Sequence, residues 1–125
     1  MKRVLFLDDD EERHKLVEKY TIGRDMSITH VWNFDQAVQE LQDKVFDAAW
    51  LDHDLCIEDQ MCNPYDSKEK NGTALANWMR DNLPIERWPT TIIVHSFNGP
   101  GAREMLKIFV EAGHTKHIHK PFGTS

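Results

Sequence analysis

The sequence has few cysteines, no long hydrophobic run and no leader-like N-terminus. Cys56 and Cys62 are the only two cysteines among its 125 residues, and we expect both to be reduced thiols. No further Cys or His pair at ligand spacing accompanies them, which argues against a zinc site. Every apolar stretch is shorter than the about 20 residues that cross a membrane, and the run Val4–Leu7 is too short for a secretory signal. We therefore expect a cytoplasmic protein without a membrane span.

Positive charge is also scarce. The 15 Lys and Arg residues are outnumbered by 21 Asp and Glu residues, so the net charge is −6. General DNA binding needs a basic surface and is therefore not expected. A small phosphate ligand remains compatible with this charge if a metal ion supplies the positive charge. A chain of 125 residues fits one domain with a single core, and we expect residues 1–125 to form one.

Short apolar runs rich in β-branched residues alternate with amphipathic segments along the chain. Strands are expected at residues 4–7, 28–32, 47–51, 91–94 and 115–119, and helices at residues 11–20, 34–43, 73–82 and 102–112. This alternation predicts an α/β protein whose parallel strands are joined by right-handed crossovers. Residues 56–70 are polar and irregular, and they predict a long insert loop of the kind that indicates function or disorder.

Three further expectations concern side chains outside the candidate site. In the first helix, Leu16, Val17 and Tyr20 have the spacing of a buried face. Among the aromatic residues, Trp88 and Tyr65 lie in expected loops and are candidates to face a ligand, whereas the other tryptophans are expected in the core or at its rim. The histidines at 114, 117 and 119 are expected to be solvated on an edge strand rather than to form a metal cluster.

Polar and charged residues gather at the ends of four expected strands. Burial of several carboxylates directly after apolar runs is costly, and a helix cap would need only one of them. In an open parallel sheet, ligands bind at the carboxyl ends of the strands, so these residues are expected to form one site. The residues are Asp8, Asp9, Asp52, His53, Asp54, His95, Ser96 and Lys120.

Neighbouring carboxylates repel one another unless a cation holds them. A hard divalent ion with oxygen ligands resolves the repulsion, and Mg²⁺, or else Mn²⁺, is the expected cofactor. The candidate ligands are Asp8, Asp9 and Asp52, with Asp54 as a further candidate. Together with a lysine ammonium, such an ion would make a positive pocket for a phosphoryl group.

The other strand-end residues suit phosphate chemistry. Ser96 would donate a hydrogen bond to a phosphate oxygen, Lys120 would contribute its charge, and either His53 or His95 would transfer a proton. A plainer interpretation of His53, as a histidine that is hydrogen-bonded to the adjacent loop, remains open at this point.

The strand-end pattern resembles that of a response-regulator receiver domain. The resemblance rests on the acidic pair after the first strand, on Asp52 and Ser96 at their strand ends, and on Lys120-Pro121 after the last strand. The spacing from Gly113 to Lys120 in AGHTKHIHKPF is also similar to that of receivers. This resemblance implies a three-layer flavodoxin-like fold with strand order 2-1-3-4-5. It also implies that the acidic pair binds Mg²⁺, that Asp52 accepts a phosphoryl group, and that Ser96 and Lys120 contact it.

The departures from an ordinary receiver resemble a more specific family. LDHDL is followed by the long insert, strand four ends in HSFNGPGAREM, and few residues remain after the last strand, so the fifth helix of a receiver is expected to be missing. LDHDL together with HSxNxxGAxxM resembles the cyclic-phosphate processing receiver domains. That resemblance implies action on a phosphate-containing small molecule or an RNA end that carries a cyclic phosphate. The residues Asn98, Gly99 and Gly101 would then open the following helix as an anion-binding turn.

Three functions are consistent with these observations. The first is a metal-dependent esterase that opens a cyclic phosphate, and the second is a stand-alone receiver that is phosphorylated on Asp52 and signals through a protein partner. The third is a degenerate receiver that only binds a nucleotide or a protein. Without the fifth helix, one helix would cover a sheet face that two helices normally share, so the 56–70 insert or a homodimer is expected to cover the remainder.

Overall fold

The computed structural model describes residues 1–55 and 70–121, and its elements alternate as the sequence predicts. The elements are β1 (Lys2–Leu7), α1 (Glu11–Thr21), β2 (Met26–Val31), α2 (Phe34–Asp43), β3 (Ala48–Leu51), α4 (Gly72–Asn82), the 3₁₀ turn η1 (Ile85–Arg87), β4 (Thr91–Val94), α5 (Gly99–Ala112) and β5 (His117–His119). The largest differences from the predicted bounds are that α5 begins three residues earlier and β5 is shorter. Apart from Lys70, the predicted insert lies outside the described residues, as do both cysteines and Tyr65.

The five strands form one parallel sheet in the predicted order β2-β1-β3-β4-β5. The register aligns Leu7, Leu51 and Val94 across β1, β3 and β4. The ladder continues one residue further, because Asp52 N donates to Leu7 O at 3.1 Å and His95 N donates to Leu51 O at 2.9 Å. The acidic residues and the histidine that follow the apolar runs therefore lie side by side at the carboxyl edge of the sheet.

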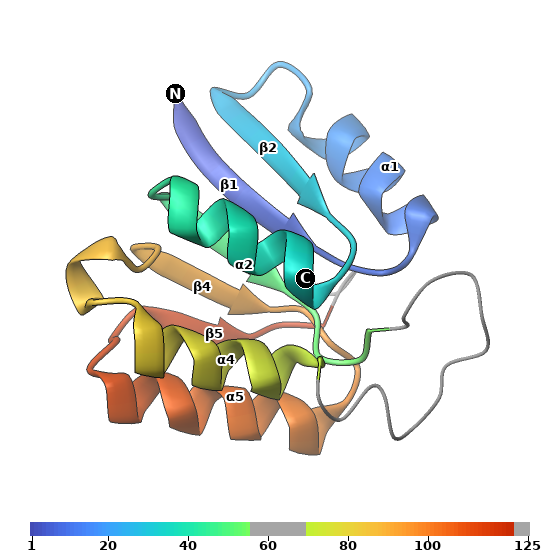
Figure 1. Ribbon diagram of the computed structural model, residues 1–125. Helices are drawn as coiled ribbons and strands as arrows, with labels where there is room; N and C mark the ends of the chain where they lie inside the picture. The colour runs from blue at the N-terminus through green and yellow to red at the C-terminus, as the bar shows by residue number, and fades with distance from the viewer. Residues whose placement is uncertain (56–69, 122–125) are drawn as a thin grey trace.

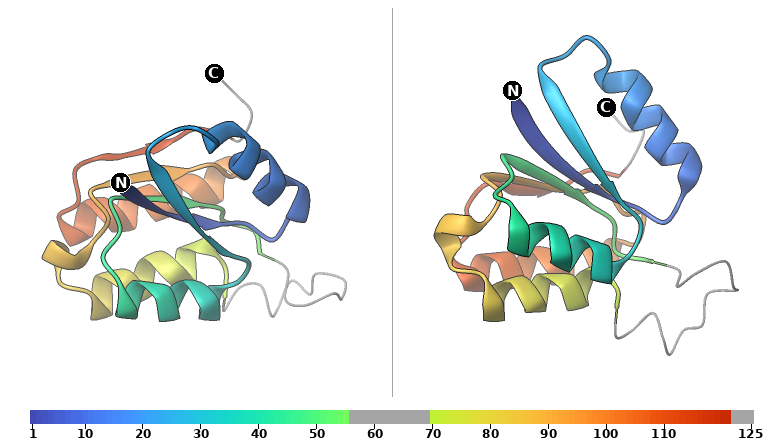
Figure 2. Two further views of the ribbon diagram at one scale, coloured as in Figure 1. Left: turned by 90° about the horizontal axis from the view of Figure 1, so that it is seen from above. Right: turned by 45° about the horizontal axis from the view of Figure 1, so that its top comes forward.

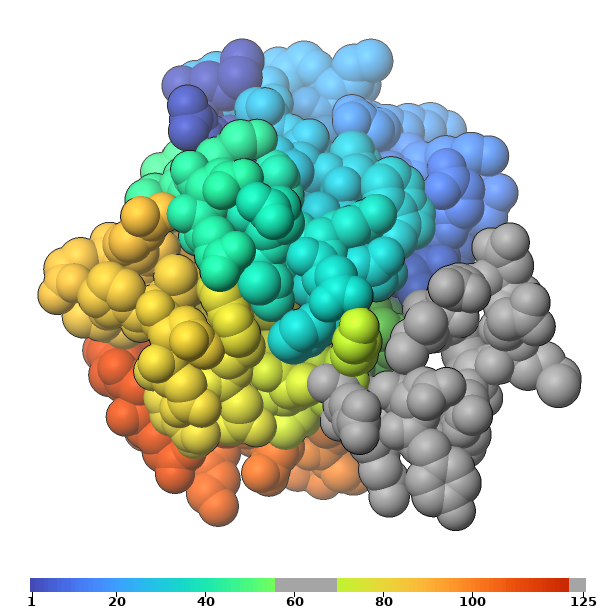
Figure 3. Space-filling model, in the orientation of Figure 1, coloured from blue at the N-terminus to red at the C-terminus, as the bar shows by residue number. Residues whose placement is uncertain are grey.

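The main core lies between the sheet and three helices. Figures 1 and 2 show α2, α4 and α5 on one face of the sheet and α1 on the other, beside β1 and β2. The space-filling view shows α2 and α4 in contact over the core (Figure 3). No helix follows β5 within residues 120–121, the last that the structure describes. The largest buried side chains of this core are Leu5, Leu7, Leu41, Phe46, Leu51, Leu75, Met79, Ile92, Met105 and Phe109.

The predicted face of α1 is wrong. Val17 is buried, but Leu16 and Tyr20 have exposed fractions of 51% and 69%. The buried stripe consists instead of His14, Val17 and Thr21. Two of these are polar residues that find partners: Thr21 Oγ1 donates to Val17 O at 2.8 Å, and a His14 ring nitrogen bonds to the backbone oxygen of Asp8. Burial of satisfied polar groups was invisible to a pattern based on apolar spacing.

The helices begin and end at residues with the expected chemistry. Asp10 caps α1 by accepting from Glu12 N at 2.9 Å, which leaves Asp8 and Asp9 for another role. Asn33 caps α2, and Gly113 ends α5 with a φ of 94°, a left-handed conformation that glycine adopts readily. No helix among the described residues is long and apolar enough to cross a membrane.

Two predictions about side chains far from the strand ends are also wrong. Trp88 is only 4% exposed: the turn η1 folds it onto Phe109, and its Nε1 donates to Leu83 O at 3.1 Å. Trp88 is therefore a core residue and faces no ligand. His114 is buried rather than solvated, because its ring stacks on Trp88 and its Nδ1 lies 3.0 Å from His117 Nδ1.

Candidate metal and phosphate site

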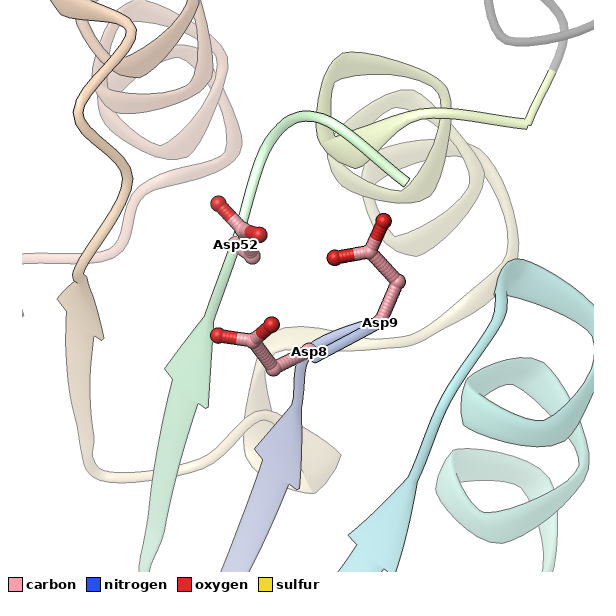
Figure 4. Close-up of side chains that lie close together, drawn as sticks. All are labelled: Asp8, Asp9 and Asp52. Carbon is pink, nitrogen blue, oxygen red and sulfur yellow. The ribbon is translucent and has the colours of Figure 1, made fainter. Parts of the chain in front are cut away.

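Three aspartates meet at the carboxyl edge of the sheet. Asp8 and Asp9 follow β1, Asp52 follows β3, and the candidate ligand atoms of all three lie within 4.8 Å of one another. Figure 4 shows the Asp8 and Asp52 carboxylates side by side, with Asp9 on the third side of the cluster. Asp8 and Asp52 are buried, and Asp9 is partly exposed. In the described part of the chain, this is the only group of three metal-ligating side chains so close together.

The donor set fits a hard divalent cation. Mg²⁺ prefers carboxylate oxygens at about 2.1 Å in an octahedron, so two ligands of one ion lie about 3 to 4 Å apart. Separations within 4.8 Å reach this range after small side-chain rotations. The group that fits is Asp8, Asp9 and Asp52, and it does not contain Asp54.

The electrostatics of Asp52 also favour a cation. Burial and the charges of Asp8 and Asp9 raise the pKa of Asp52 to about 7, although the amide of His53 donates to its Oδ1 at 2.8 Å. At neutral pH this carboxyl is therefore poised between its charged and uncharged forms. A cation that contacts all three carboxylates would offset the repulsion from Asp8 and Asp9, which adds to the larger effect of burial on this pKa.

Helix α1 contributes two site residues that the strand-end pattern did not identify. Arg13 Nη1 lies 3.2 Å from Asp8 Oδ2 and 3.8 Å from Asp52 Oδ2. A ring nitrogen of His14 lies 2.8 Å from Asp8 O and ties the helix to the end of β1. Only their position in the sequence could have indicated them. Both lie in the first turn of α1, and this turn follows the Asp10 cap and so begins beside the acidic pair.

His95 lies beneath the aspartates and is built into the sheet. Its Nε2 donates to Leu7 O at 3.1 Å, its ring stacks on Phe6, and its Nδ1 lies 3.6 Å from Asp8 Oδ2. Burial lowers the pKa of His95 to about 4, so the ring is neutral at pH 7. A neutral ring that donates through Nε2 presents the Nδ1 edge to Asp8.

Ser96 and Lys120 lie at the same edge but do not contact the aspartates directly. Ser96 is buried and its Oγ accepts from Asn98 N at 3.0 Å, while the backbone of Lys120 extends the ladder by donating to Val94 O at 2.8 Å. Within the described residues, neither side chain forms an ion pair or a hydrogen bond with the three aspartates.

A second polar cluster, here called the histidine joint, consists of His53, Asp54, Thr73 and Asn98. The His53 ring lies 2.7 Å from Asp54 Oδ1 through Nδ1 and 2.9 Å from Thr73 Oγ1 through Nε2. Asn98 Nδ2 donates to Asp54 Oδ1 at 3.0 Å. The bonds from His53 and Asn98 lower the pKa of Asp54 against the effect of its partial burial. The joint therefore connects the end of β3 to the first residues of both α4 and α5.

The glycines at the start of α4 and α5 make room for this joint. A Cβ on Gly101 would lie 2.6 Å from His53 Cγ, and a Cβ on Gly72 would lie 2.6 Å from Asp52 O. Asn98 Oδ1 also accepts from Gly101 N at 2.9 Å, so that amide is already paired within the cap of α5. Gly99, the first residue of α5, has only the tip of Arg103 near its Cβ position.

Comparison with known families identifies the chain. The model of the cyclic-phosphate processing receiver domain matches residues 3–111, which include β2, β3 and β4, all but the first residue of β1, and both polar clusters. The chain belongs to this family. It is a receiver domain of response-regulator type, and the resemblance that LDHDL and HSxNxxGAxxM suggested is confirmed. Comparison with curated proteins gives no match.

Solved structures of receiver domains share the fold of this domain. A receiver domain protein from Methanospirillum hungatei has a TM-score of 0.66 and 18% identity, over 98% of this chain and 84% of the other. The receiver domain of a sensor histidine kinase from Pseudomonas aeruginosa, with a magnesium ion in its active-site cleft, has a TM-score of 0.65 and 20% identity, over 97% and 86%. The response regulator TrrA from Thermotoga maritima, in complex with Mg²⁺ and BeF, has a TM-score of 0.66 and 16% identity, over 98% and 90%.

The receiver fold accounts for the geometry of the acidic site in this domain. Parallel pairing of β1 with β3 places the Asp8-Asp9 pair beside Asp52, as the receiver resemblance implied. The family motifs, by contrast, divide between the two clusters. His95 and Ser96 lie at the sheet edge near the aspartates, whereas His53, Asp54 and Asn98 belong to the histidine joint.

Proposed function

We propose that this receiver domain binds a cyclic phosphate, on a nucleotide or an RNA end, at a Mg²⁺ ion held by Asp8, Asp9 and Asp52, and opens the ring by hydrolysis. The observation that carries the proposal is the set of three carboxylates within 4.8 Å in a chain of the cyclic-phosphate processing family. When bound, the ion would polarise the phosphate and offset the charge that develops on its oxygens. Mn²⁺ prefers the same oxygen ligands and is expected to substitute.

The two candidate histidines differ in their freedom to transfer a proton. Both ring nitrogens of His53 are engaged, one with Asp54 and one with Thr73. The Nδ1 edge of His95 faces the aspartates and its ring is neutral at pH 7, which is the form that accepts a proton. We therefore assign proton transfer to His95 and a positioning role to His53. Ser96 and Lys120, at the same edge, are assigned to phosphate oxygens.

The direct test is turnover of a 2′,3′-cyclic nucleotide with and without Mg²⁺, followed by separation of the cyclic and linear monophosphates. We expect Mg²⁺-dependent hydrolysis, lost by about 100-fold or more in Asp52→Asn and in His95→Gln because each removes a group that acts on the reacting phosphate. His114→Gln is the matched control, since His114 lies at the opposite end of the sheet. Hydrolysis that persists in both site variants would contradict the proposal.

One observation favours a second candidate, phosphorylation of Asp52. Asp52 is a buried carboxylate at the end of β3 beside an acidic pair, and the similar TrrA structure was solved with Mg²⁺ and BeF. Incubation with acetyl phosphate and Mg²⁺, followed by intact-mass measurement, distinguishes the two. A stable gain of one phosphoryl group, absent in Asp52→Asn and accompanied by no cyclic-nucleotide turnover, would favour the phosphoacceptor.

A further inference from the structure

We propose that Arg13 is a further residue of this site that binds the phosphate, in addition to Ser96 and Lys120. In the metal-free protein its guanidinium is held by Asp8 and Asp52, and it turns to the phosphate oxygens once those carboxylates hold a divalent cation. The inference rests on the proposed metal site and names a residue that lies outside the family motifs quoted above.

The Arg13 guanidinium forms ion pairs with both buried aspartates of the site. Arg13 Nη1 lies 3.4 Å and 3.2 Å from the two oxygens of Asp8 and 3.8 Å from Asp52 Oδ2, so one cation reaches two of the three candidate ligands. Among the described residues, Arg13 is the only Arg or Lys that pairs with Asp8 or Asp52. The positive charge of Arg13 thus offsets the repulsion between the closely spaced carboxylates when no metal ion is bound.

Arg13 and a bound metal ion would compete for these carboxylates. A divalent ion at this site would bind the carboxylates of Asp8 and Asp52 that Arg13 contacts, and it would repel a guanidinium a few ångströms away. The two cations therefore compete, and the arginine has to give up at least part of its contact when the ion arrives. A guanidinium released next to a metal is placed to meet the anion that the metal attracts.

A backbone hydrogen bond and a ring contact position Arg13 beside the site. The backbone of Arg13 is fixed in the first turn of α1, where Arg13 N donates to Asp10 O at 3.1 Å. Its guanidinium carbon lies 5.5 Å from the centre of the Phe97 ring, which belongs to the segment between β4 and α5. Phe97 is largely exposed, and this contact brings the Arg13 guanidinium near the segment that joins β4 to α5.

The guanidinium of Arg13 suits a phosphate group better than an ammonium does. A guanidinium donates two parallel hydrogen bonds to a pair of phosphate oxygens, a geometry that an ammonium lacks. The side chain of Lys120 is exposed and forms no ion pair within the described part of the chain, whereas Arg13 is already at the aspartates. Arg13 thus serves as counter-ion to the carboxylates in the free protein and as anion ligand in the complex.

The test measures two affinities separately by calorimetry, first Mg²⁺ alone and then inorganic phosphate in saturating Mg²⁺. We expect Arg13→Gln to bind Mg²⁺ about tenfold more tightly, because the competing charge is gone, and to bind phosphate about 10- to 100-fold more weakly. Arg13→Lys keeps the charge but not the paired donors, so its Mg²⁺ affinity should stay near that of the wild type while phosphate binding falls. Arg80→Gln is the control, since Arg80 pairs with Asp81 and Glu111 on the far helices.

The outcomes separate this inference from the proposed function. If Arg13→Gln leaves the affinities for Mg²⁺ and for phosphate unchanged, Arg13 forms only a surface ion pair and the inference is overturned. A wild-type protein that binds no Mg²⁺ or no phosphate would overturn it as well. Opposite changes in the two affinities without any cyclic-nucleotide turnover would retain Arg13 as the phosphate ligand and refute only the hydrolysis. Circular dichroism of each variant confirms that the fold is intact.

Discussion

At the scale of single residues, Asp52 and His95 respond to pH in opposite directions. Burial and neighbouring carboxylates raise the pKa of Asp52 from 3.8 to about 7. The contribution of Asp52 to the stability of the fold is therefore fully present at low pH, below 3.8, and is lost as the pH rises through 7. Burial lowers the pKa of His95 from 6.5 to about 4, so its contribution is present above pH 6.5 and is lost as the pH falls through 4. Between these limits the two contributions offset each other.

We therefore predict that, in metal-free protein, single variants of these two residues change the pH dependence of the free energy of unfolding in opposite directions. Relative to the wild type, the free energy of unfolding of Asp52→Asn should rise from pH 4 to pH 6.5, and that of His95→Gln should fall, each by up to about 3 kcal/mol. Urea unfolding at several pH values measures both curves, and comparison with the wild type cancels the other titrating groups. Parallel curves for the three proteins would contradict the assigned shifts.

The strand-end acids are the part of the site that sequence reasoning could reach. An apolar run that ends in carboxylates is a local signal, and parallel pairing brings Asp8, Asp9 and Asp52 together without further information. The position of Arg13 in the first turn of α1 places it near the acidic pair, but its contacts with Asp8 and Asp52 depend on the direction in which that turn leaves β1, which no local pattern gives. The roles of His53 and His95 stayed open for the same reason, since neighbours distant in sequence decide where each ring points.

At the scale of secondary-structure elements, the histidine joint sets how α4 and α5 begin. The His53 ring fills the space that a side chain at Gly101 would need, and its Nε2 bonds to Thr73 at the start of α4. A single ring therefore fixes the relative positions of two helices and the end of β3, and the Asp52 carboxylate is attached directly to that end.

We predict strong coupling between His53 and Gly101. Gly101→Ala should destabilise the protein by about 2 kcal/mol because its Cβ overlaps the imidazole, and the same change should be tolerated in a His53→Ala background. Gly99→Ala is the matched control, because its Cβ meets only the flexible end of Arg103 at 3.3 Å. A double-mutant cycle by thermal unfolding measures the coupling, and additive effects would show that the ring does not set the spacing.

Gly72 should behave differently from Gly101. Its Cβ would lie 2.6 Å from the backbone oxygen of Asp52 and 2.7 Å from the Cα of His53, and these backbone atoms remain when the imidazole is removed. We expect Gly72→Ala to cost about 2 to 4 kcal/mol in both backgrounds. Rescue of this variant by His53→Ala, read from the same unfolding curves, would contradict the backbone contact.

At the scale of the whole molecule, the acidic site links metal binding to folding. Only the folded chain brings Asp8, Asp9 and Asp52 within 4.8 Å, so an ion that needs all three binds the folded state alone. With Mg²⁺ at about ten times its dissociation constant, the free energy of unfolding should rise by about 1.4 kcal/mol. Thermal unfolding with and without Mg²⁺ measures this rise, and Asp8→Asn should abolish most of it, whereas Asp47→Asn, at the other end of the sheet, should not.

The sheet face beside α1 bears on the predicted homodimer. The register aligns Trp50, Ile93 and Ile118 across β3, β4 and β5, and Ile118 is 52% exposed. Figure 2 shows α1 over β1 and β2 only, among the described helices. The homodimer stays a prediction, for which we expect a sedimentation mass that rises with concentration and a weaker association in Ile118→Lys. A constant mass of one chain would remove it.

The sequence alone determined the α/β alternation and the acidic edge, because both follow from local patterns: apolar strands, helix caps and carboxylates at strand ends. The strand order came from the resemblance of the strand-end motifs to receiver domains, and the structure has that order. The tertiary structure alone decided which side chains face one another across elements. It turned Leu16 and Tyr20 outward, buried Trp88, put Arg13 over the aspartates and fitted His53 against Gly101. Those outcomes depend on how helices sit against the sheet, and packing between segments distant in sequence sets that geometry.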